Sequence, residues 1–179
     1  KRLRNDLLAT PVLRVEWGKR DAAGYYRDEF CLVWDRRIDV DIGMPQPFLT
    51  PENLGAYKLP DPAAPGRFEA LKRNIREHPD RFQVLALDFS LFERAWGLRG
   101  LEAFLLDLLE RPDFAGELLD RILQFNLQVI DAGLSACPQV DAVYSGDDFG
   151  SQAGILMGPD LRRRMLKPRL ARQYAAVKA

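Results

Sequence analysis

The sequence is poor in the residues that build most metal sites and nucleophilic catalytic systems. Its 179 residues include one histidine, His78, and two cysteines, Cys31 and Cys137, which lie far apart. Zinc needs several Cys, His or acidic ligands close together, so we expect no metal site within this chain. A single histidine also leaves little from which to assemble a Ser-His-Asp or Cys-His system. Two cysteines form no disulfide framework, and a reducing cytoplasmic setting is expected.

Long apolar runs and a net charge are also missing. No apolar stretch approaches the ~18 residues that span a bilayer, and no signal peptide is visible, so we expect no membrane partner. Lys plus Arg and Asp plus Glu number 26 each, so nothing in the overall charge points to nucleic acid. Residues 160–179 nevertheless hold seven basic residues and one acid, a net charge of +6. This segment is either a solvated helix face or a docking surface.

The apolar content of 47% is sufficient for the core of one domain. The chain opens on "KRLRNDLLAT" without an initiator Met and stops inside a helical pattern at "QYAAVKA". We therefore expect a fragment of a longer protein. The N-terminal region, residues 1–66, combines strands with a proline-rich excursion over 44–66, and residues 67–179 change to helical and buried-strand patterns.

The pattern of apolar residues predicts the following elements. In the N-terminal region they are strands at 11–17, 29–35 and 37–43, the last two antiparallel. After residue 67 they are a helix at 67–78, a buried strand at 82–89, helices at 100–111 and 114–134, a strand at 140–145, and a helix that opens at Gly158-Pro159 and is kinked at Pro168. Pro112 is expected to end the helix at 100–111, and Asp113 to be the N-cap of the next helix.

Alternation of helices with buried strands predicts an α/β fold with a parallel sheet. The sheet is either an open doubly wound sheet or a (β/α)8 TIM barrel. No G-x-G-x-x-G motif follows either strand, which weakens the dinucleotide-binding alternative. A complete barrel takes ~250 residues, so this chain would hold only part of one.

In parallel α/β folds the reactive residues lie at the carboxyl ends of strands. Two segments follow the buried runs, "LDFSLFERAWGLRG" from Asp88 and "SGDDFGSQ" from Ser145. Both carry acids directly after the apolar residues. We expect the two segments to open onto a common pocket.

In the second segment, Asp147 and Asp148 are the candidate catalytic carboxylates. In an extended backbone their side chains point to opposite sides, so one should face the pocket and the other should cap or brace the loop. Gly146 lets the backbone approach a ligand, and Gln152 offers a donor and an acceptor to a substrate. The alternative is a Gly-Asp-Asp turn that caps the following helix.

In the first segment, Asp88, Phe89 and Glu93 predict a second, substrate-binding wall that is acidic and aromatic. The alternative is that the aromatic residues belong to the core and the acids are loop charges. Arg94 and Arg99 could bind substrate carboxylates in bidentate fashion, or could be surface arginines.

Several segments together resemble the uroporphyrinogen decarboxylase superfamily. These are "DEFCLVWDRRIDVDIGMPQP", the "LPDP" that follows, "FERAWGLRGLEAFLLDLLERPDF" and "VDAVYSGDDFGSQAGILMGPDLRRRMLKPRL". The resemblance covers roughly residues 11–179 and implies a (β/α)8 barrel, of which residues 67–179 would be the first several βα units.

This resemblance implies one of two activities. One arm of the superfamily decarboxylates uroporphyrinogen without a cofactor, and the other transfers methyl groups between a corrinoid on a partner protein and a small molecule, often with zinc. The Arg-Gln-Ala-Gly-Arg-Tyr stretch of the decarboxylases is matched here only by Arg20, Gly24 and Tyr25, and their Phe-Ser-Asp segment is replaced by "LDFSLFE". We therefore place the methyltransferase ahead of the decarboxylase.

The cofactors and partners follow from the same resemblance. The methyltransferase arm implies a corrinoid protein as partner, and zinc bound by a His-x-Cys and a later Cys beyond Ala179. A small-molecule substrate is expected in either arm, and a homodimer is left open. A third alternative is a non-catalytic subunit that binds a corrinoid protein, with residues 160–179 as the docking surface.

Overall fold

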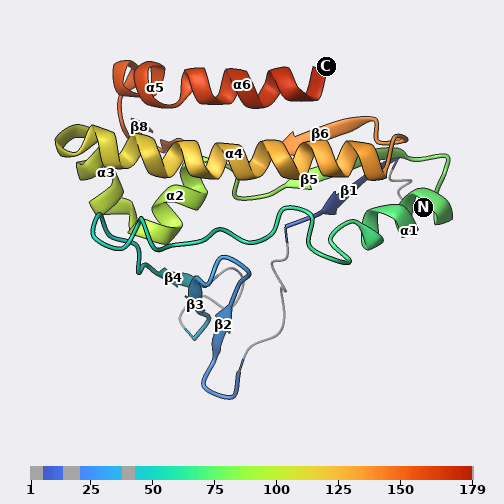
Figure 1. Cartoon of the computed structure of the whole chain (residues 1–179), viewed down its shortest axis with the longest axis horizontal. Coiled ribbons are helices and arrows are strands. Elements are labelled where there is room, and N and C mark those ends of the chain that lie inside the picture. The colour runs from blue at the N-terminus through green and yellow to red at the C-terminus, as the bar shows by residue number, and fades with distance from the viewer. Residues whose placement is uncertain (1–5, 14–20, 38–42, 179) are drawn as a thin grey trace.

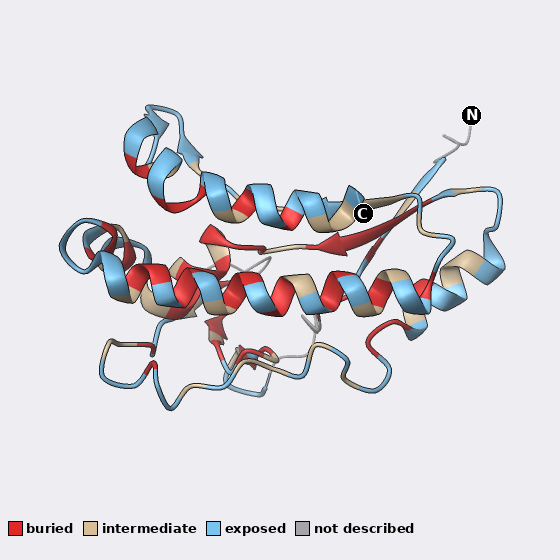
Figure 2. Cartoon of the chain, turned by 45° about the horizontal axis from the view of Figure 1, so that its top comes forward, coloured by how far each residue is buried: buried red, intermediate tan, exposed pale blue. Residues whose placement is uncertain are grey.

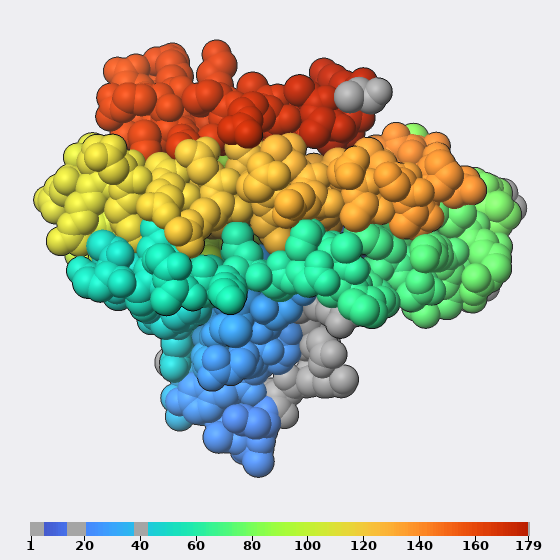
Figure 3. Space-filling view, viewed as in Figure 1, coloured from blue at the N-terminus to red at the C-terminus, as the bar shows by residue number. Residues whose placement is uncertain are grey.

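The computed structural model describes residues 6–13, 21–37 and 43–178, which form a mixed α/β structure. A parallel sheet and long helices make up its body, and a small antiparallel sheet projects from that body (Figures 1 and 3). The strands are β1 Leu7–Pro11, β2 Tyr25–Arg27, β3 Val33–Asp35, β4 Met44–Gln46, β5 Phe82–Leu87, β6 Ala142–Ser145, β7 Gly150–Ser151 and β8 Gly154–Ile155. The helices are α1 Glu69–Glu77, α2 Phe92–Arg99, α3 Leu101–Glu110, α4 Pro112–Ala136, α5 Pro159–Met165 and α6 Lys167–Lys178. None of these helices combines the length and apolar character needed to cross a membrane.

Three parallel strands form the main sheet in the order β1-β5-β6. The central strand β5 is buried along almost its whole length (Figure 2). Leu85 of β5 pairs with Thr10 on one side and Val143 on the other, so these side chains share one face of the sheet. Helices cover this face: Nδ2 of Asn74 in α1 donates to the Thr10 hydroxyl at 2.8 Å, and α4 crosses Leu85 so closely at Gly133 that a Cβ there would overlap its side chain.

The prediction of an α/β fold with a parallel sheet is confirmed, and β5, β6, α1, α3 and α4 lie close to the ranges that the sequence indicates. The described residues form no closed barrel. The opening of α5 is also as expected, with Gly158 as N-cap and Pro159 as the first helical residue. A break at Leu166 separates α5 from α6 near Pro168, in agreement with the predicted kink.

The structure has three helices between β5 and β6, whereas the sequence analysis expects two. The additional helix, α2, is buried on most of its surface, including Phe92, Ala95 and Leu98. A helix that is surrounded by other residues shows no alternation of apolar and polar faces, and periodicity therefore misses it. The expected N-cap at Asp113 is also wrong, because Arg111 is the N-cap of α4 and Pro112 is its first helical residue.

The predicted strands of the N-terminal region are only partly correct. The strand expected at 11–17 is wrong over its described part, because β1 spans Leu7–Pro11 and shares only Pro11 with it, while Val12 and Leu13 lie outside any strand and residues 14–17 lie outside the described residues. Of the strand expected at 29–35, only β3 is extended, because the Asp28 carboxylate accepts the backbone N–H groups of Phe30 and Leu32 and holds a turn there. Most of the strand expected at 37–43 lies outside the described residues.

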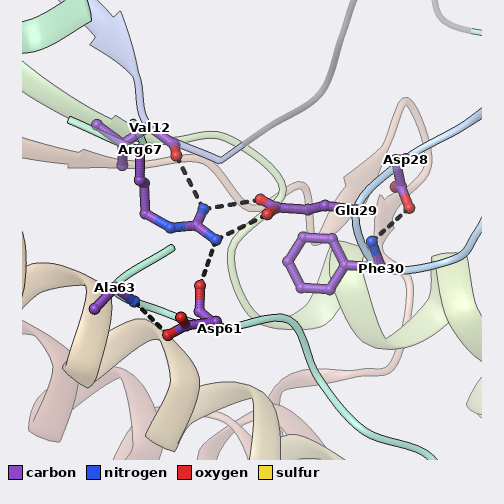
Figure 4. A network of polar contacts seen from close by, with 7 residues as sticks. All are labelled: Val12, Asp28, Glu29, Phe30, Asp61, Ala63 and Arg67. Carbon is purple, nitrogen blue, oxygen red and sulfur yellow. Dashed lines mark hydrogen bonds and ion pairs between the residues drawn. The ribbon is translucent and has the colours of Figure 1, made fainter. Parts of the chain in front are cut away.

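A buried arginine joins the N-terminal region to the body of the molecule (Figure 4). Nη1 of Arg67 donates to the backbone oxygen of Val12 at 3.0 Å, and Nη1 and Nη2 hold the Glu29 carboxylate at 2.9 and 2.8 Å. Nη2 also donates to the backbone oxygen of Asp61 at 2.7 Å. One side chain therefore connects the end of β1, the turn before β3 and the proline-rich segment.

Candidate functional site

An open pocket of about 640 Å³ lies at the carboxyl ends of β5 and β6. It is lined by residues from the ends of these two strands and from the segments that follow them: Asp88, Phe89, Glu93, Tyr144, Gly146, Asp147 and Asp148. The structure thus brings together six of the residues that the sequence analysis names. It adds Tyr144 and leaves out Gln152.

Hydrogen bonds beyond the two strands hold the walls of the pocket side by side. The backbone N–H of Gly146 donates to the Leu87 oxygen at 3.0 Å, and the N–H of Ser90 donates to the Gly146 oxygen at 2.9 Å. Behind this point the hydroxyls of Ser145 and Ser90 lie 2.8 Å apart, and Nε2 of Gln173 in α6 donates to both. A buried polar network therefore fixes the position of both strand ends.

Asp147 is the most constrained of the pocket carboxylates. Its oxygens accept the backbone N–H groups of Leu91, Phe92 and Glu93 at 3.2, 3.0 and 2.8 Å. These N–H groups open α2 and have no partner within the helix, so Asp147 caps α2 from the neighbouring strand end. The helix that it caps follows β5, whereas the sequence analysis considers a cap on the helix after the Gly-Asp-Asp turn. Burial raises the pKa of Asp147 to about 6, against the three hydrogen bonds that lower it.

Glu93 lies at the start of α2 and shares the pocket with Asp147. Burial raises its pKa to about 7, and the nearby charges of Asp147 and Asp148 add to this shift. The backbone N–H of Asp148 and the charge of Arg94 act in the opposite direction. A carboxyl group with a pKa near neutrality can both give and accept a proton at physiological pH, as a general acid or base requires.

Asp88 directly follows β5 and lines the pocket. Burial raises its pKa, and the charge of Arg94 opposes the shift. No hydrogen bond or ion pair to its carboxylate is found among the described residues. Asp88 is therefore a half-buried carboxylate that is free to contact a ligand.

The hairpin after Asp148 carries Gln152 away from the pocket. Oδ1 of Asp148 accepts the backbone N–H of Gly150 at 2.9 Å, which turns the chain into the β7–β8 hairpin. Gln152 lies exposed in the turn of this hairpin and does not line the pocket. The hairpin is anchored by Phe149, whose ring lies 5.8 Å from that of Phe92.

Two aromatic rings complete the pocket. Phe89 stacks on Trp34 of β3, with ring centroids 5.6 Å apart and an interplanar angle of 19°. Tyr144 is 53% exposed, and a Cβ at Gly146 would lie 3.2 Å from its phenolic oxygen, so the glycine leaves room for the ring at the strand end. Sequence reasoning missed Tyr144 because it treated this residue as part of an apolar strand. The signal was its spacing of two residues from Gly146, which places both on one face.

The two arginines considered from the sequence as ligands for substrate carboxylates bind acidic side chains of the protein instead. Arg94 is 1% exposed and donates to the Asp28 carboxylate at 3.1 Å, with its guanidinium 3.8 Å from the centroid of the Phe30 ring. Nε of Arg99 donates to Asp107 at 2.6 Å. Neither lines the pocket.

The acidic residues of the pocket do not converge on one point. Throughout residues 6–13, 21–37 and 43–178, no group of His, Cys, Asp or Glu side chains is arranged to hold a metal ion. The lining of the pocket combines four carboxylic acids with two aromatic rings.

A larger groove of about 930 Å³ lies on the outer surface between α4 and the α5–α6 pair. Its charges are largely neutralised in pairs, such as Arg169 with Asp120 at 2.7 Å and Arg121 with Glu117 at 2.6 Å. This groove lies away from the carboxyl ends of the strands, where parallel α/β folds place their reactive residues. It is therefore not the candidate active site.

The chain matches no family model, no curated protein and no solved structure in comparisons with known proteins.

Proposed function

We propose that the chain forms the first βα units of a (β/α)8 barrel enzyme of the uroporphyrinogen decarboxylase superfamily, acting as a corrinoid-linked methyltransferase on a small molecule. The observation that carries the proposal is that the segments following β5 and β6 meet in one pocket. This is where barrel enzymes place their reactive residues.

The order of the strands supports the barrel. β1, β5 and β6 are neighbours in the order in which they occur along the chain, all are parallel, and helices connect β5 to β6. Parallel strands that follow one another in chain order without a reversal are what the first units of a barrel require, and one half of a doubly wound sheet has the same order.

The pocket residues have distinct roles in this proposal. Glu93 exchanges a proton with the substrate, because its pKa of about 7 suits both directions of transfer. Asp88 and Asp148 bind a positively charged or N–H-bearing part of the substrate. Asp147 positions Glu93 by holding the first turn of α2.

A corrinoid on a partner protein would supply or accept the methyl group. Zinc is assigned no step on this chain, because its described residues do not form a group of metal ligands. Substrate binding, orientation and proton exchange are the contributions that the pocket residues can make.

Methyl transfer from methylcobalamin to a thiol, followed by the change in the corrinoid absorption spectrum, tests the proposal. The wild-type protein should be compared with Glu93→Gln and, as a matched control, with Glu102→Gln on the exposed surface of α3. We expect Glu93→Gln to lower the rate ~10²-fold or more at unchanged folding, as is usual for loss of a general acid or base, and the control to equal the wild type. No transfer by the folded wild type would contradict the methyltransferase.

Two other functions give different results. The decarboxylase alternative, which the resemblance also implies, predicts carbon dioxide release from uroporphyrinogen without added metal. A non-catalytic corrinoid-binding subunit predicts that Glu93→Gln and Asp88→Asn leave biological activity intact, while charge reversal at Arg164 and Lys167 in the basic C-terminal segment removes it.

A further inference from the structure

The protein offsets the negative charge of the pocket only in part, through the nearby charge of Arg94. Four of its seven lining residues are carboxylic acids, and none is Lys, Arg or His. The nearest buried cation, Arg94, is already paired with Asp28. The raised pKa values of Asp88, Glu93 and Asp147 reflect the cost of holding negative charge in this cavity. A cationic ligand would remove that cost.

The shape and lining of the pocket restrict the kind of cation. A small divalent ion needs several oxygen ligands that converge at ~2.0–2.6 Å, and the carboxylates of the described residues do not converge in this way. The volume of about 640 Å³ is that of a site for an organic molecule.

The two aromatic rings favour a specific chemical class. Phe89 stacks on Trp34 and has the Arg94 guanidinium 5.7 Å from its ring centroid, so Tyr144, which is 53% exposed and stands over Gly146 at the strand end, is the ring that is open to a ligand. Aromatic faces combined with carboxylates are the surroundings in which quaternary and methylated ammonium groups bind, since the ring faces attract a large, weakly hydrated cation.

We propose that this pocket binds an organic ammonium ion with a methylated nitrogen, and that such a compound is the small-molecule substrate. The substrate class rests on the proposed function, whereas the binding itself depends only on the pocket. The same charge distribution disfavours uroporphyrinogen, because its many carboxylates would face Asp88, Glu93 and Asp148 without an arginine among the lining residues.

Choline and its neutral isostere 3,3-dimethylbutan-1-ol provide a direct test. The two probes have the same shape and differ in the charge on one atom. Calorimetric titration of the wild-type protein should show choline binding at least ten times more tightly than the isostere. Equal affinity, or no binding of either probe by the folded protein, would overturn the inference.

Variants of the pocket locate the binding. Asp88→Asn should weaken choline binding ~3- to 10-fold, because an ion pair is lost in a partly buried site. Tyr144→Leu should weaken it several-fold through loss of the ring face while leaving the isostere unaffected. Glu102→Gln is the matched control and should bind as the wild type does. Circular dichroism and a thermal melt of each variant establish that it is folded, and unchanged choline affinity in both folded pocket variants would place the binding elsewhere and overturn the inference.

The inference and the proposed function fail in different ways. If the protein transfers methyl groups to a thiol but does not distinguish choline from its isostere, the substrate class is wrong and the methyltransferase stands. If choline is bound selectively and no methyl transfer occurs with any donor, the organic-cation site stands and the methyltransferase is wrong.

Discussion

The Asp147 carboxylate accepts the backbone N–H of Glu93 at 2.8 Å, although the two residues lie in different βα units. In the reverse direction, the backbone N–H of Asp148 lies near the Glu93 carboxyl group and lowers its pKa. The loop after β6 thus holds the start of α2 through the Asp147 carboxylate. This contact fixes the position of Glu93 in the acidic wall of the pocket.

Removal of the Asp147 cap should destabilise the protein. Asp147→Ala leaves three N–H groups of α2 without their acceptor, and we expect a loss of ~1–2 kcal/mol in the free energy of unfolding. Asp147→Asn retains one acceptor oxygen and should cost less. Urea denaturation measures both, with Asp148→Ala as the control, because Asp148 bonds only an exposed N–H two residues away. An equal loss in Asp147→Ala and the control would contradict the role of Asp147.

Stability should fall as the pH rises toward neutrality. The folded-state pKa of Glu93, about 7, and that of Asp147, about 6, both lie above their ordinary values. Each group therefore binds its proton more tightly in the folded state, and this stabilisation is complete below the ordinary pKa and is lost as pH rises through about 6 and about 7. Thermal melts across this range should show a smaller decline for Glu93→Gln than for the wild type. The same decline in both proteins would show that Glu93 titrates normally.

The common position of Asp88 and Asp147 could be predicted from the sequence, because parallel strands end at the same edge of a sheet and both residues follow apolar runs. The role of Asp147 could not be predicted. Its partners are N–H groups of α2, more than fifty residues away, and no local pattern encodes that contact. Gln152 was misplaced for a related reason, since Asp148 turns the chain into a hairpin that leaves the pocket.

The fold was predictable where burial follows a period. β5 is a continuous apolar run, and α4 has one apolar face, so both were found near their observed bounds. α2 was missed because it is buried on most sides. The expected strand at 29–35 failed over its first half because the Asp28 side chain competes for the backbone N–H groups that a strand would use.

The buried pair Asp28–Arg94 should be costly to break from either side. Asp28 accepts from Arg94 at 3.1 Å, and Nε and Nη2 of Arg94 have no partner among the described residues. Asp28→Asn leaves a buried guanidinium without its counter-ion, and we expect a loss of ~3–5 kcal/mol. The double variant Asp28→Asn plus Arg94→Met should lose less free energy of unfolding than the sum of the losses in the two single variants, as measured in a double-mutant cycle.

The exposed pair Arg163–Asp160 is the control for this cycle, and its coupling energy should be below ~1 kcal/mol. Additive losses at the buried pair would refute the coupling.

Close packing of α4 on β5 should make Gly133 intolerant of a side chain. A Cβ at Gly133 would overlap Leu85, which is fully buried, and come within 3.1 Å of Cε1 of Phe68. Gly133→Ala should therefore lower the free energy of unfolding by ~1–3 kcal/mol, despite the gain in helix propensity. Gly116→Ala in the same helix is the matched control, because the nearest neighbour of a Cβ there is a guanidinium nitrogen at the tip of the Arg169 side chain, at 3.3 Å, which needs to shift by only a few tenths of an ångström. That variant should be neutral or slightly more stable. Equal effects at the two positions would show that the contact with Leu85 yields at little cost.

Binding of an organic ammonium ion should strengthen as the pH rises. Between pH ~5.5 and ~8, Glu93 and Asp147 lose their protons, given pKa values of about 7 and about 6, and the pocket becomes more negative. Arg94, the positive charge beside this wall, stays paired with Asp28. The dissociation constant for choline should therefore fall across this range, and that of 3,3-dimethylbutan-1-ol should not change. In Glu93→Gln the fall should be smaller, because one titrating group is missing. An affinity for choline that is independent of pH, with the protein folded throughout, would mean that these carboxylates do not face the bound cation.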